Sequence, residues 1–421
     1  MMNIDRHRHF MLPDFFKAPK NSDRVLNPVR VITVIFLTLS LVGFLLIFSP
    51  SITHAQQSGQ KFKLRLNGYL KELGSLGAGN QFEHFQYDNI LHNRIESEWS
   101  YGQNLTLNAD LRTRLINGYT VRHQPGYAEL LENDPGYADL SWTPVHTSQS
   151  ILHTNIDRLN LSYYSGDFQV NFGRQRINWS RTFVWSPNDL FNNFAYLDFD
   201  YEERPGTDAL NLQYSWSYAS SVQLTTQFGH HWDESVIASM LRSSLGTYDV
   251  QVVAGHYYDQ WALGAGWAGY LKSAGFKGEI TYFQPEHNFL KQSGHFTATT
   301  GLDYMFPSSL YVQGEILYNG GWKRTLNPTA QLLQPPRADN LFIARTATFL
   351  NLSYPVHPLI NVSFSSIISP DRPIYVFIPQ ATFSLSDNVD LLLLSQLFQG
   401  RILKQATPTP NYFYFRIKWS F

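Results

Sequence analysis

The last ten residues of the chain, from Tyr412 to Phe421, constrain its fold more than any other stretch. Side chains alternate between the two faces of an extended strand. One face therefore carries Phe413, Phe415, Ile417, Trp419 and Phe421. The other face carries Tyr412, Tyr414, Arg416, Lys418 and Ser420. An aromatic face opposite a charged one is typical of a strand between lipid and an aqueous lumen. For this segment alone, the alternative is an edge strand of a soluble sandwich.

The same two-faced pattern recurs along the chain, and residues 105–115 show it most clearly. Their apolar face holds Leu105, Leu107, Ala109, Leu111 and Leu115. Their polar face holds Thr106, Asn108, Asp110, Arg112 and Arg114. Three charges would be prohibitive in a packed core, whereas they cost little in contact with water. No helical periodicity is sustained between such strands, so we predict an all-β fold.

The connectors between the expected strands alternate between short and long. The short ones are residues 102–103, 165–167, 217–220, 243–247, 272–275, 307–309, 355–358 and 387–388. The long ones are residues 72–86, 117–152, 178–208, 284–294, 320–341 and 400–411. Bacterial barrels place short turns at the periplasmic end and long loops at the extracellular end. We therefore predict a transmembrane antiparallel up-and-down β-barrel of about 18 strands, with 16 as the alternative because residues 213–270 can be counted in two ways.

The composition excludes several classes of protein. The 421 residues include no Cys, which excludes a disulfide scaffold, a thiolate metal site and a cysteine nucleophile. The formal net charge of −1 gives no electrostatic footprint for nucleic acid. Aromatic residues reach 15%, which favours strands and interfacial belts.

The N-terminal region has the layout of an export signal. Residues 31–48 form an apolar run that follows several Lys and Arg residues, and the small-x-small sequence Thr53-His54-Ala55 comes shortly after it. We therefore expect a signal-bearing region at 1–55 and one barrel domain at 56–421. A retained inner-membrane anchor is the alternative, and Met11 is an alternative start.

The third long connector, residues 178–208, holds eight aromatic residues. A loop surrounded by water would give these rings nothing to pack against, so we expect the third extracellular loop to fold inward and narrow the pore. Its sequence Ser186-Pro187-Asn188-Asp189 combines an N-cap residue, a proline at the first helical position and an early acid. That combination predicts a short helix.

Charged residues on this loop and on the polar faces of the strands are the candidates for a pore constriction. They are Arg112, Arg114, Arg158, Asp189, Asp198, Asp200, Glu202, Glu203 and Arg204. We expect the acids of the loop to face arginines of the wall, which would orient a polar solute. Mutual ion pairing that merely satisfies the interior is the alternative. Alternation from Phe172 would point Arg174 and Arg176 into lipid. We therefore predict that a bulge at Gly173 reverses the register, and their position near the outer end of the strand also reduces the cost.

Several motifs resemble those of porin-like and alginate-export-like outer-membrane barrels. They are Gly173-Arg174-Gln175, Trp179, Pro187-Asn188-Asp189, and Arg204-Pro205-Gly206 with Asp208-Ala209. The final strand also resembles the C-terminal targeting strand of Gram-negative outer-membrane barrels. The resemblance implies a bacterial outer-membrane channel without a cofactor, in contact with outer-membrane lipid and lipopolysaccharide. It also implies that the barrel assembly machinery recognises the segment from Tyr412 to Phe421. It sets neither the solute nor the oligomeric state.

We therefore interpret the chain as a channel for passive or substrate-selective diffusion of small polar solutes. A polysaccharide export barrel, a surface-recognition barrel and a barrel-wall hydrolase are the alternatives. No spacing singles out a Ser–His set, and His230-His231 lacks a third spaced ligand, so we expect neither an enzyme nor a metal site.

Overall fold

A computed structural model describes residues 62–421, except 79–84, 194, 199, 201–203, 288, 290, 324–335 and 401–410. The expected export signal therefore lies outside the described residues. The strands are β1 (Phe62–Ala78), β2 (Gln86–Tyr101), β3 (Leu105–Gly118), β4 (Ser141–His146), β5 (Ser150–Ser165), β6 (Phe168–Gln175), β7 (Thr207–Ser217), β8 (Ser220–Gln227), β9 (Val236–Leu245), β10 (Tyr248–Tyr257), β11 (Gln260–Leu271), β12 (Ala274–Pro285), β13 (His295–Met305), β14 (Tyr311–Asn319), β15 (Thr346–His357), β16 (Ile360–Ser369), β17 (Ile374–Ser386), β18 (Val389–Gly400) and β19 (Asn411–Ser420). The helical segments are α2 (Tyr119–His123), α3 (Tyr127–Glu132) and the 3-10 turn η1 (Trp232–Glu234). No helix within the described ranges is long and apolar enough to cross a membrane.

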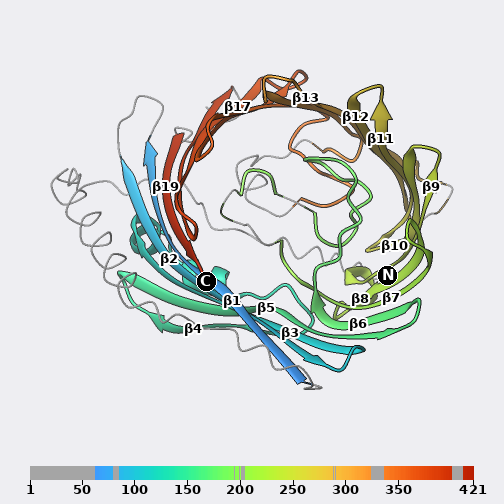
Figure 1. Cartoon of the computed structure of the whole chain (residues 1–421), viewed down its shortest axis with the longest axis horizontal. Coiled ribbons are helices and arrows are strands. Elements are labelled where there is room, and N and C mark those ends of the chain that lie inside the picture. The colour runs from blue at the N-terminus through green and yellow to red at the C-terminus, as the bar shows by residue number, and fades with distance from the viewer. Residues whose placement is uncertain are drawn as a thin grey trace, which may run out of the picture.

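Eighteen of these strands close into a barrel, and β4 is an additional strand outside that count (Figure 1). Each barrel strand pairs antiparallel with the next, and β19 returns to pair with β1. At the closing seam the amide of Phe421 donates to the carbonyl of Gly68 at 2.9 Å, and the amide of Gly68 donates back at 3.0 Å. The predicted antiparallel barrel is therefore confirmed, with the larger of the two strand counts.

The pairing register separates an apolar outer surface from a polar inner one. One cross-strand row joins Leu64, Trp99, Leu107, Leu161, Phe172 and Leu210. The adjacent row on the other face joins Arg65, Glu98, Asn108 and Asn160. Because side chains alternate along every strand, the first row faces outward and the second faces the lumen. An outward apolar surface of this kind is what a membrane-spanning barrel presents to lipid.

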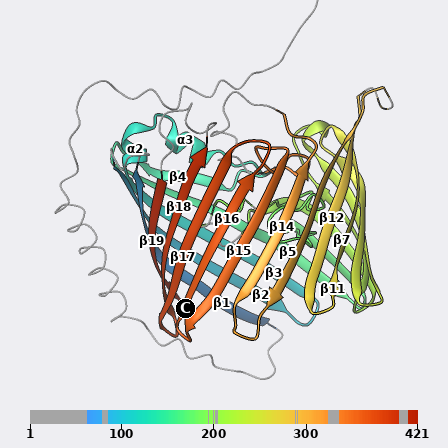
Figure 2. The same cartoon turned by 90° about the horizontal axis from the view of Figure 1, so that it is seen from above.

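The two ends of the barrel differ as the connector lengths predict. The C-terminus lies at the end with the tight turns, whereas α2 and α3 lie at the opposite end (Figure 2). Gly102 and Gly166 occupy two of the tight turns with φ of 63° and 58°, a region that favours glycine. Two details differ from the expectation. β1 continues to Ala78, beyond the expected end near residue 71, because both neighbours pair with it there. A tight turn also joins β10 to β11 at the long-loop end.

The second long connector folds back onto the wall. After α2 and α3, β4 pairs with the part of β5 between Ile151 and Asn155, whereas β6 pairs with β5 between Leu159 and Ser165. β4 thus covers the edge of β5 that β6 leaves unpaired. Covering such an edge matters because unpaired backbone groups are costly in lipid.

The predicted bulge at Gly173 is wrong. Neither pairing of β6 shifts register there. Gly173 instead has φ of 110°, and a Cβ atom at this position would lie 2.2 Å from the carbonyl oxygen of Leu159. The irregularity lies in β5, where Asp157 is an extra residue between the partners of Asp110 and Leu111.

Candidate functional site

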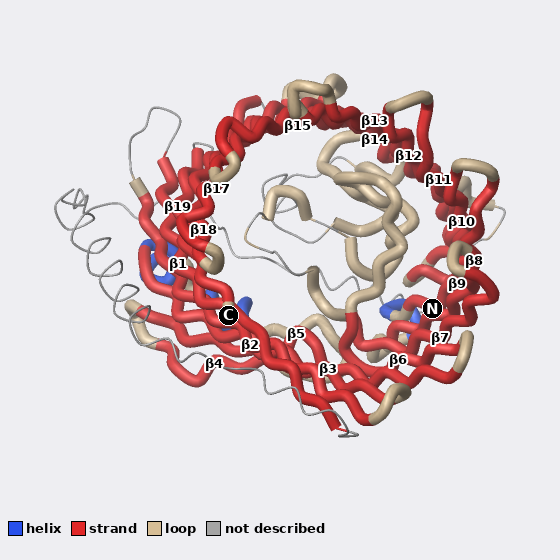
Figure 3. The backbone as a smooth tube through the Cα atoms, viewed as in Figure 1, coloured by secondary structure: helices blue, strands red, loops and turns tan. Residues whose placement is uncertain are grey.

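The connector between β6 and β7 runs inside the barrel (Figure 3). Hydrogen bonds join it to several wall strands in turn. The carbonyl of Trp179 accepts a hydrogen bond from Gln251 of β10 at 2.8 Å. The hydroxyl of Tyr196 donates to Ser365 of β16 at 2.9 Å. Later residues reach β18 and β1. We call the described residues between 176 and 206 the lumen loop.

Two carboxylates of the wall hold the first half of the lumen loop. Glu315 of β14 accepts the backbone N–H groups of Phe183, Val184 and Trp185 at 2.7, 3.2 and 2.8 Å. Glu279 of β12 accepts N–H groups of residues 181, 182 and 188 and the hydroxyl of residue 186. Both glutamates are buried. Because a carboxylate offers two oxygens and about four acceptor positions, each can satisfy several loop donors at once.

These contacts explain why the predicted helix at residues 186–189 does not form. The hydroxyl of Ser186 donates to Glu279 at 2.7 Å, so it does not cap a helix. The amide of Asn188 donates to the same carboxylate at 3.0 Å. The segment forms a turn in which the amide of Asp189 donates to the carbonyl of Ser186 at 3.3 Å. The wall carboxylate thus outcompetes the local helix signal.

Apolar packing fixes the lumen loop against β9–β18. Val184 and Trp185 join a buried cluster with residues of β14–β18, including Phe349, Ile367 and Leu392. Trp179 and Leu190 join a second cluster with residues of β7 and β9–β12, namely Ala209, Val236, Ala238, Met240, Val253, Tyr257, Ala262 and Phe283. The loop therefore covers apolar clusters on the lumen faces of these strands, beside polar groups such as Glu279 and Glu315 that hydrogen-bond to it.

Close approach between the lumen loop and β11 requires glycine. A Cβ atom on Gly264 would lie 2.4 Å from Oδ1 of Asn188, and one on Gly266 would lie 2.8 Å from its Nδ2. These glycines therefore leave the space that the amide of Asn188 occupies.

The wall formed by β1–β6 is polar, and its charges are paired among themselves. The buried Arg94 forms ion pairs with Glu96 and Asp110 at 2.9 Å each, and also with Asp157. Arg112 forms an ion pair with Asp157 at 3.4 Å. The extra residue in β5 thus puts a carboxylate between two arginines. Such a network is costly to break, because removing one partner leaves a buried charge uncompensated.

The three candidate arginines of the wall all lie on the lumen side and have partners in the wall or the loop. Arg112 also donates to Oδ1 of Asn155 at 3.0 Å, and Arg114 contacts Nδ1 of His153 at 3.1 Å. Arg158 donates to the carbonyls of Asp157 and Arg204. Arg112 is thus partly balanced by a carboxylate of the wall, and Arg114 and Arg158 also contact a histidine and backbone carbonyls. That the acids of the loop balance these arginines stays a prediction.

Only one of the described candidate acids of the loop lies near the wall arginines. Asp189 is buried and pairs with Arg204 of the same loop at 3.0 Å. Burial raises the pKa of Asp189 to about 6, although Arg204 opposes this. Asp198 does lie near the wall arginines. Burial raises its pKa, and Asp200 adds to the rise, while Arg112 and Arg114 oppose it. Glu202 and Glu203 lie outside the described residues.

Asp200 binds the opposite end of the lumen loop to β1 and β2. Its carboxylate lies 2.7 Å from Nζ of Lys71 and 3.9 Å from Nδ1 of His92. The same Nζ donates to the backbone carbonyl of Asp200 at 3.0 Å. Burial alone would raise the pKa of Asp200, but the nearby His92 and the charge of Lys71 lower it to about 2. We call this contact the Asp200 latch.

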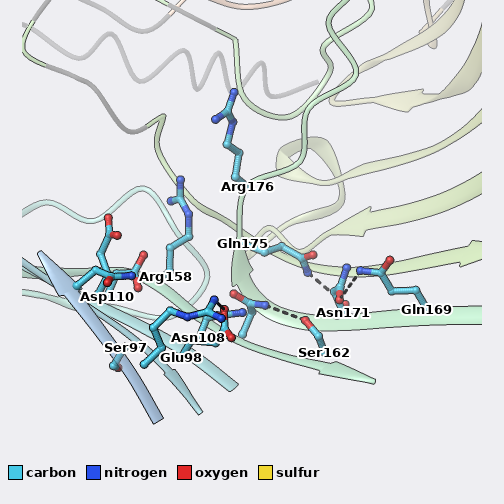
Figure 4. Close-up of a pocket in the computed structure, with 14 residues that line it drawn as sticks. Ser97, Glu98, Asn108, Asp110, Arg158, Ser162, Gln169, Asn171, Gln175 and Arg176 are labelled. Carbon is cyan, nitrogen blue, oxygen red and sulfur yellow. Dashed lines mark hydrogen bonds and ion pairs between the residues drawn. The ribbon is translucent and has the colours of Figure 1, made fainter. Parts of the chain in front are cut away.

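A polar pocket of about 420 Å³ lies against β1–β3, β5 and β6 (Figure 4). Its lining residues are Arg65, Asn67, Glu96, Ser97, Glu98, Asn108, Asp110, Arg158, Asn160, Ser162, Gln169, Asn171, Gln175 and Arg176. Figure 4 shows Gln169, Asn171 and Gln175 on one side of the pocket and Asp110 and Arg158 on the other. Of the candidate constriction residues, Arg158 alone lines it. This pocket can hydrogen-bond a polar solute through side chains from five strands.

Sequence reasoning missed several residues that organise the lumen. Glu279 and Glu315 were recognisable as lumen-side acids, but nothing in the sequence linked them to backbone N–H groups of a distant loop. The apolar patch on the lumen face of β18 could have been predicted from the four consecutive leucines from Leu391 to Leu394. Such a run puts apolar side chains on both faces of a strand. Lys71 had no signal beyond its charge. Within the described residues, no group of three or more His, Asp or Glu side chains could hold a metal ion.

Comparisons with known proteins give a likeness of fold. No protein-family model and no curated protein sequence matches the chain. Among solved structures, OccAB1 of Acinetobacter baumannii aligns with a TM-score of 0.54 and 8% identity, covering 89% of this chain and 99% of that one. OpdL of Pseudomonas aeruginosa aligns at 0.53 and 10%, covering 85% and 99%. A double variant of OccD1 (OprD) aligns at 0.53 and 9%, covering 85% and 95%. The chain therefore has the fold of a porin-like, multi-pass outer-membrane β-barrel.

Proposed function

We propose that the chain is an outer-membrane channel through which small polar solutes diffuse along the wall formed by β1–β6. The polar pocket beside the lumen loop carries this proposal. The loop packs against apolar clusters on β9–β18, whereas the polar pocket lies on the wall formed by β1–β6. Water and polar solutes favour such a surface, because it offers hydrogen bonds in exchange for those lost to bulk water.

Diffusion of small solutes fits this lumen better than export of an anionic polysaccharide. A polyanion would be favoured by unpaired cations along its path. Here Arg94 and Arg112 are paired with carboxylates of the wall, and Lys71 with Asp200. Surface recognition and barrel-wall hydrolysis have no comparable support in the described residues.

The outer surface supports the membrane setting of the proposal. Leu107, Leu161, Phe172 and other outward residues are exposed, as lipid contact requires. Lipopolysaccharide would contact the end that holds α2 and α3, if long loops mark the extracellular side as in other barrels. The barrel assembly machinery would recognise the segment from Tyr412 to Phe421.

Conductance in planar bilayers and swelling of liposomes test the proposal. Purified, refolded protein should give stepwise conductance in salt, and liposomes containing it should swell in small sugars and amino acids. Permeation should fall steeply as solutes grow, because the loop narrows the path. A refolded barrel that gives neither conductance nor swelling would contradict the proposal.

A further inference from the structure

The pocket on β1–β6 combines polar side chains with a balance of charge. Three of its lining residues are arginines and three are carboxylates, so their formal charges cancel. Six more are amides, namely Asn67, Asn108, Asn160, Gln169, Asn171 and Gln175. Amide side chains are therefore the most frequent group on this surface.

The carboxylates of the pocket already have cationic partners. Glu98 pairs with Arg65 at 3.3 Å. Glu96 and Asp110 each lie 2.9 Å from nitrogen atoms of the buried Arg94. A cationic solute that bound these acids would compete with an arginine already in place. The cationic solute would lose its hydration, and each ion pair it formed would replace one that the carboxylate already has.

The amides, in contrast, retain hydrogen-bonding capacity. Among the residues that the structure describes, the side chains of Asn67 and Asn108 form no hydrogen bond with the protein. Asn160 donates to Ser162 at 3.3 Å, which leaves its carbonyl oxygen available. Asn171 accepts from Gln169 at 3.2 Å, which leaves its own N–H groups available. The register puts Asn108 directly across from Asn160, so two amides on neighbouring strands face the same space.

A hydroxyl group is the natural partner of such a surface, because it both donates and accepts, as an amide does. We propose that this pocket is a binding subsite for neutral polyhydroxylated solutes of the size of a small sugar. This proposal rests on the proposed channel function. Its volume lies within the range of about 300–1,000 Å³ typical of small-molecule sites. No aromatic ring lines it, so binding rests on hydrogen bonds and is weak enough for the solute to leave.

Three solutes of one skeleton and different charge test the proposal: glucose, gluconate and protonated glucosamine. Each is titrated against the salt current of the full-length protein in planar bilayers. Glucose should reduce the current in a saturable way. Gluconate and glucosamine should need roughly tenfold higher concentrations, which corresponds to about 1.4 kcal/mol. A reduction by glucose that never saturates, as from viscosity alone, or a tighter effect of either charged solute would overturn the proposal.

A double variant assigns the effect to this pocket. Asn108→Leu with Asn160→Leu should raise the half-effect concentration of glucose, measured against the variant's own salt current, at least about tenfold. Asn361→Ala, on the lumen side of β16 and outside the pocket, is the matched control and should behave like the unmodified protein. Equal glucose effects in all three proteins would overturn the proposal.

Two further measurements keep the outcomes separate. Heat-modifiable mobility in gels reports whether each variant is folded. If the double variant fails to fold, Asn108→Ser alone should weaken the glucose effect about threefold, and an unchanged effect would contradict the proposal. Absence of any current in the folded, unmodified protein would instead refute the proposed channel, which distinguishes that failure from the failure of the sugar subsite.

Discussion

At the scale of single residues, each wall strand has one face toward lipid and one toward the lumen. Leu111 is the seventh of the 14 residues of β3 and pairs with Ile95 on β2. Thr106 lies on the opposite face of the same strand and pairs with Ser100. The two positions therefore allow a direct comparison of the same substitution on two faces.

We predict that Leu111→Arg lowers the free energy of unfolding by about 2–4 kcal/mol, because a cation near the middle of the bilayer loses its hydration. Thr106→Arg should change it little, since the side chain remains in contact with water. Urea titration of the refolded protein in lipid vesicles measures both. Similar losses for the two variants would contradict the assignment of faces on β3.

The Asp200 latch is a second feature at this scale, and its pH dependence follows from the lowered pKa. A carboxyl whose pKa falls from about 3.9 in the unfolded chain to about 2 stabilises the folded state above the first value. That contribution is lost only as the pH falls through the second. The ion pair with Lys71 should thus remain intact between pH 7 and pH 4.

We predict that Lys71→Met frees this end of the lumen loop and increases current noise of the open channel. The difference in noise between variant and unmodified protein should stay constant from pH 7 to pH 4, because Asp200 remains charged throughout. Single-channel recordings across this range measure it. A difference that disappears between pH 7 and pH 5 would show that the pKa of Asp200 is raised rather than lowered.

At the scale of elements, the position of the lumen loop depends on carboxylates of β12 and β14 as well as on apolar packing. Glu315→Ala would leave three backbone N–H groups of the loop without their acceptor, at about 1–3 kcal/mol for each buried donor that stays unsatisfied. We predict that this variant folds, conducts more noisily and shows a wider distribution of conductance levels.

Asp390→Ala is the matched control for that prediction. Asp390 shares the lumen face of β18 with Leu392 and Leu394, and its register partners are Lys418 and Ser384 near the tight-turn end. Its removal should leave the conductance distribution unchanged. If both variants broaden the distribution equally, loss of a lumen charge rather than release of the loop explains the effect.

The strands and their order were largely predictable from the sequence, whereas the interior of the barrel was not. Alternation from Leu105 to Leu115 depends on neighbouring residues, so a single strand reveals it. The contact between Glu315 and residues 183–185 joins positions about 130 residues apart, and no local pattern encodes it. The helix expected at Ser186 does not form for the same reason. The hydroxyl of Ser186 donates to the distant carboxylate of Glu279 instead of capping a helix.

At the scale of the whole molecule, closure of the sheet is the condition for stability in lipid. Phe421 exchanges two backbone hydrogen bonds with Gly68, where β19 meets β1. Its ring also lies over this glycine, since a Cβ atom there would come within 2.7 Å of the ring. An unclosed edge would leave backbone groups unsatisfied in the membrane.

We predict that deletion of Phe421 impairs assembly of the barrel and leaves export intact. The loss of both closing hydrogen bonds opens the end of the seam, and recognition of the final segment is weakened as well. The fraction of heat-modifiable protein in outer-membrane preparations measures assembly. Replacement of Leu385, an exposed residue near the β17–β18 turn, by Ser is a control that should assemble normally. Normal assembly without Phe421 would contradict the role assigned to this residue.

Cysteine accessibility tests most directly whether solutes pass along the polar wall of β1–β6. The chain contains no Cys, so an introduced thiol is unique. Asn160→Cys puts the thiol on the lumen face of β5. Leu161→Cys, one residue further along, puts it on the outward face of the same strand. A charged, water-soluble thiol reagent should block much of the current through the first variant and leave the second unchanged. Block of the second variant, or no effect on the first despite labelling, would contradict the account.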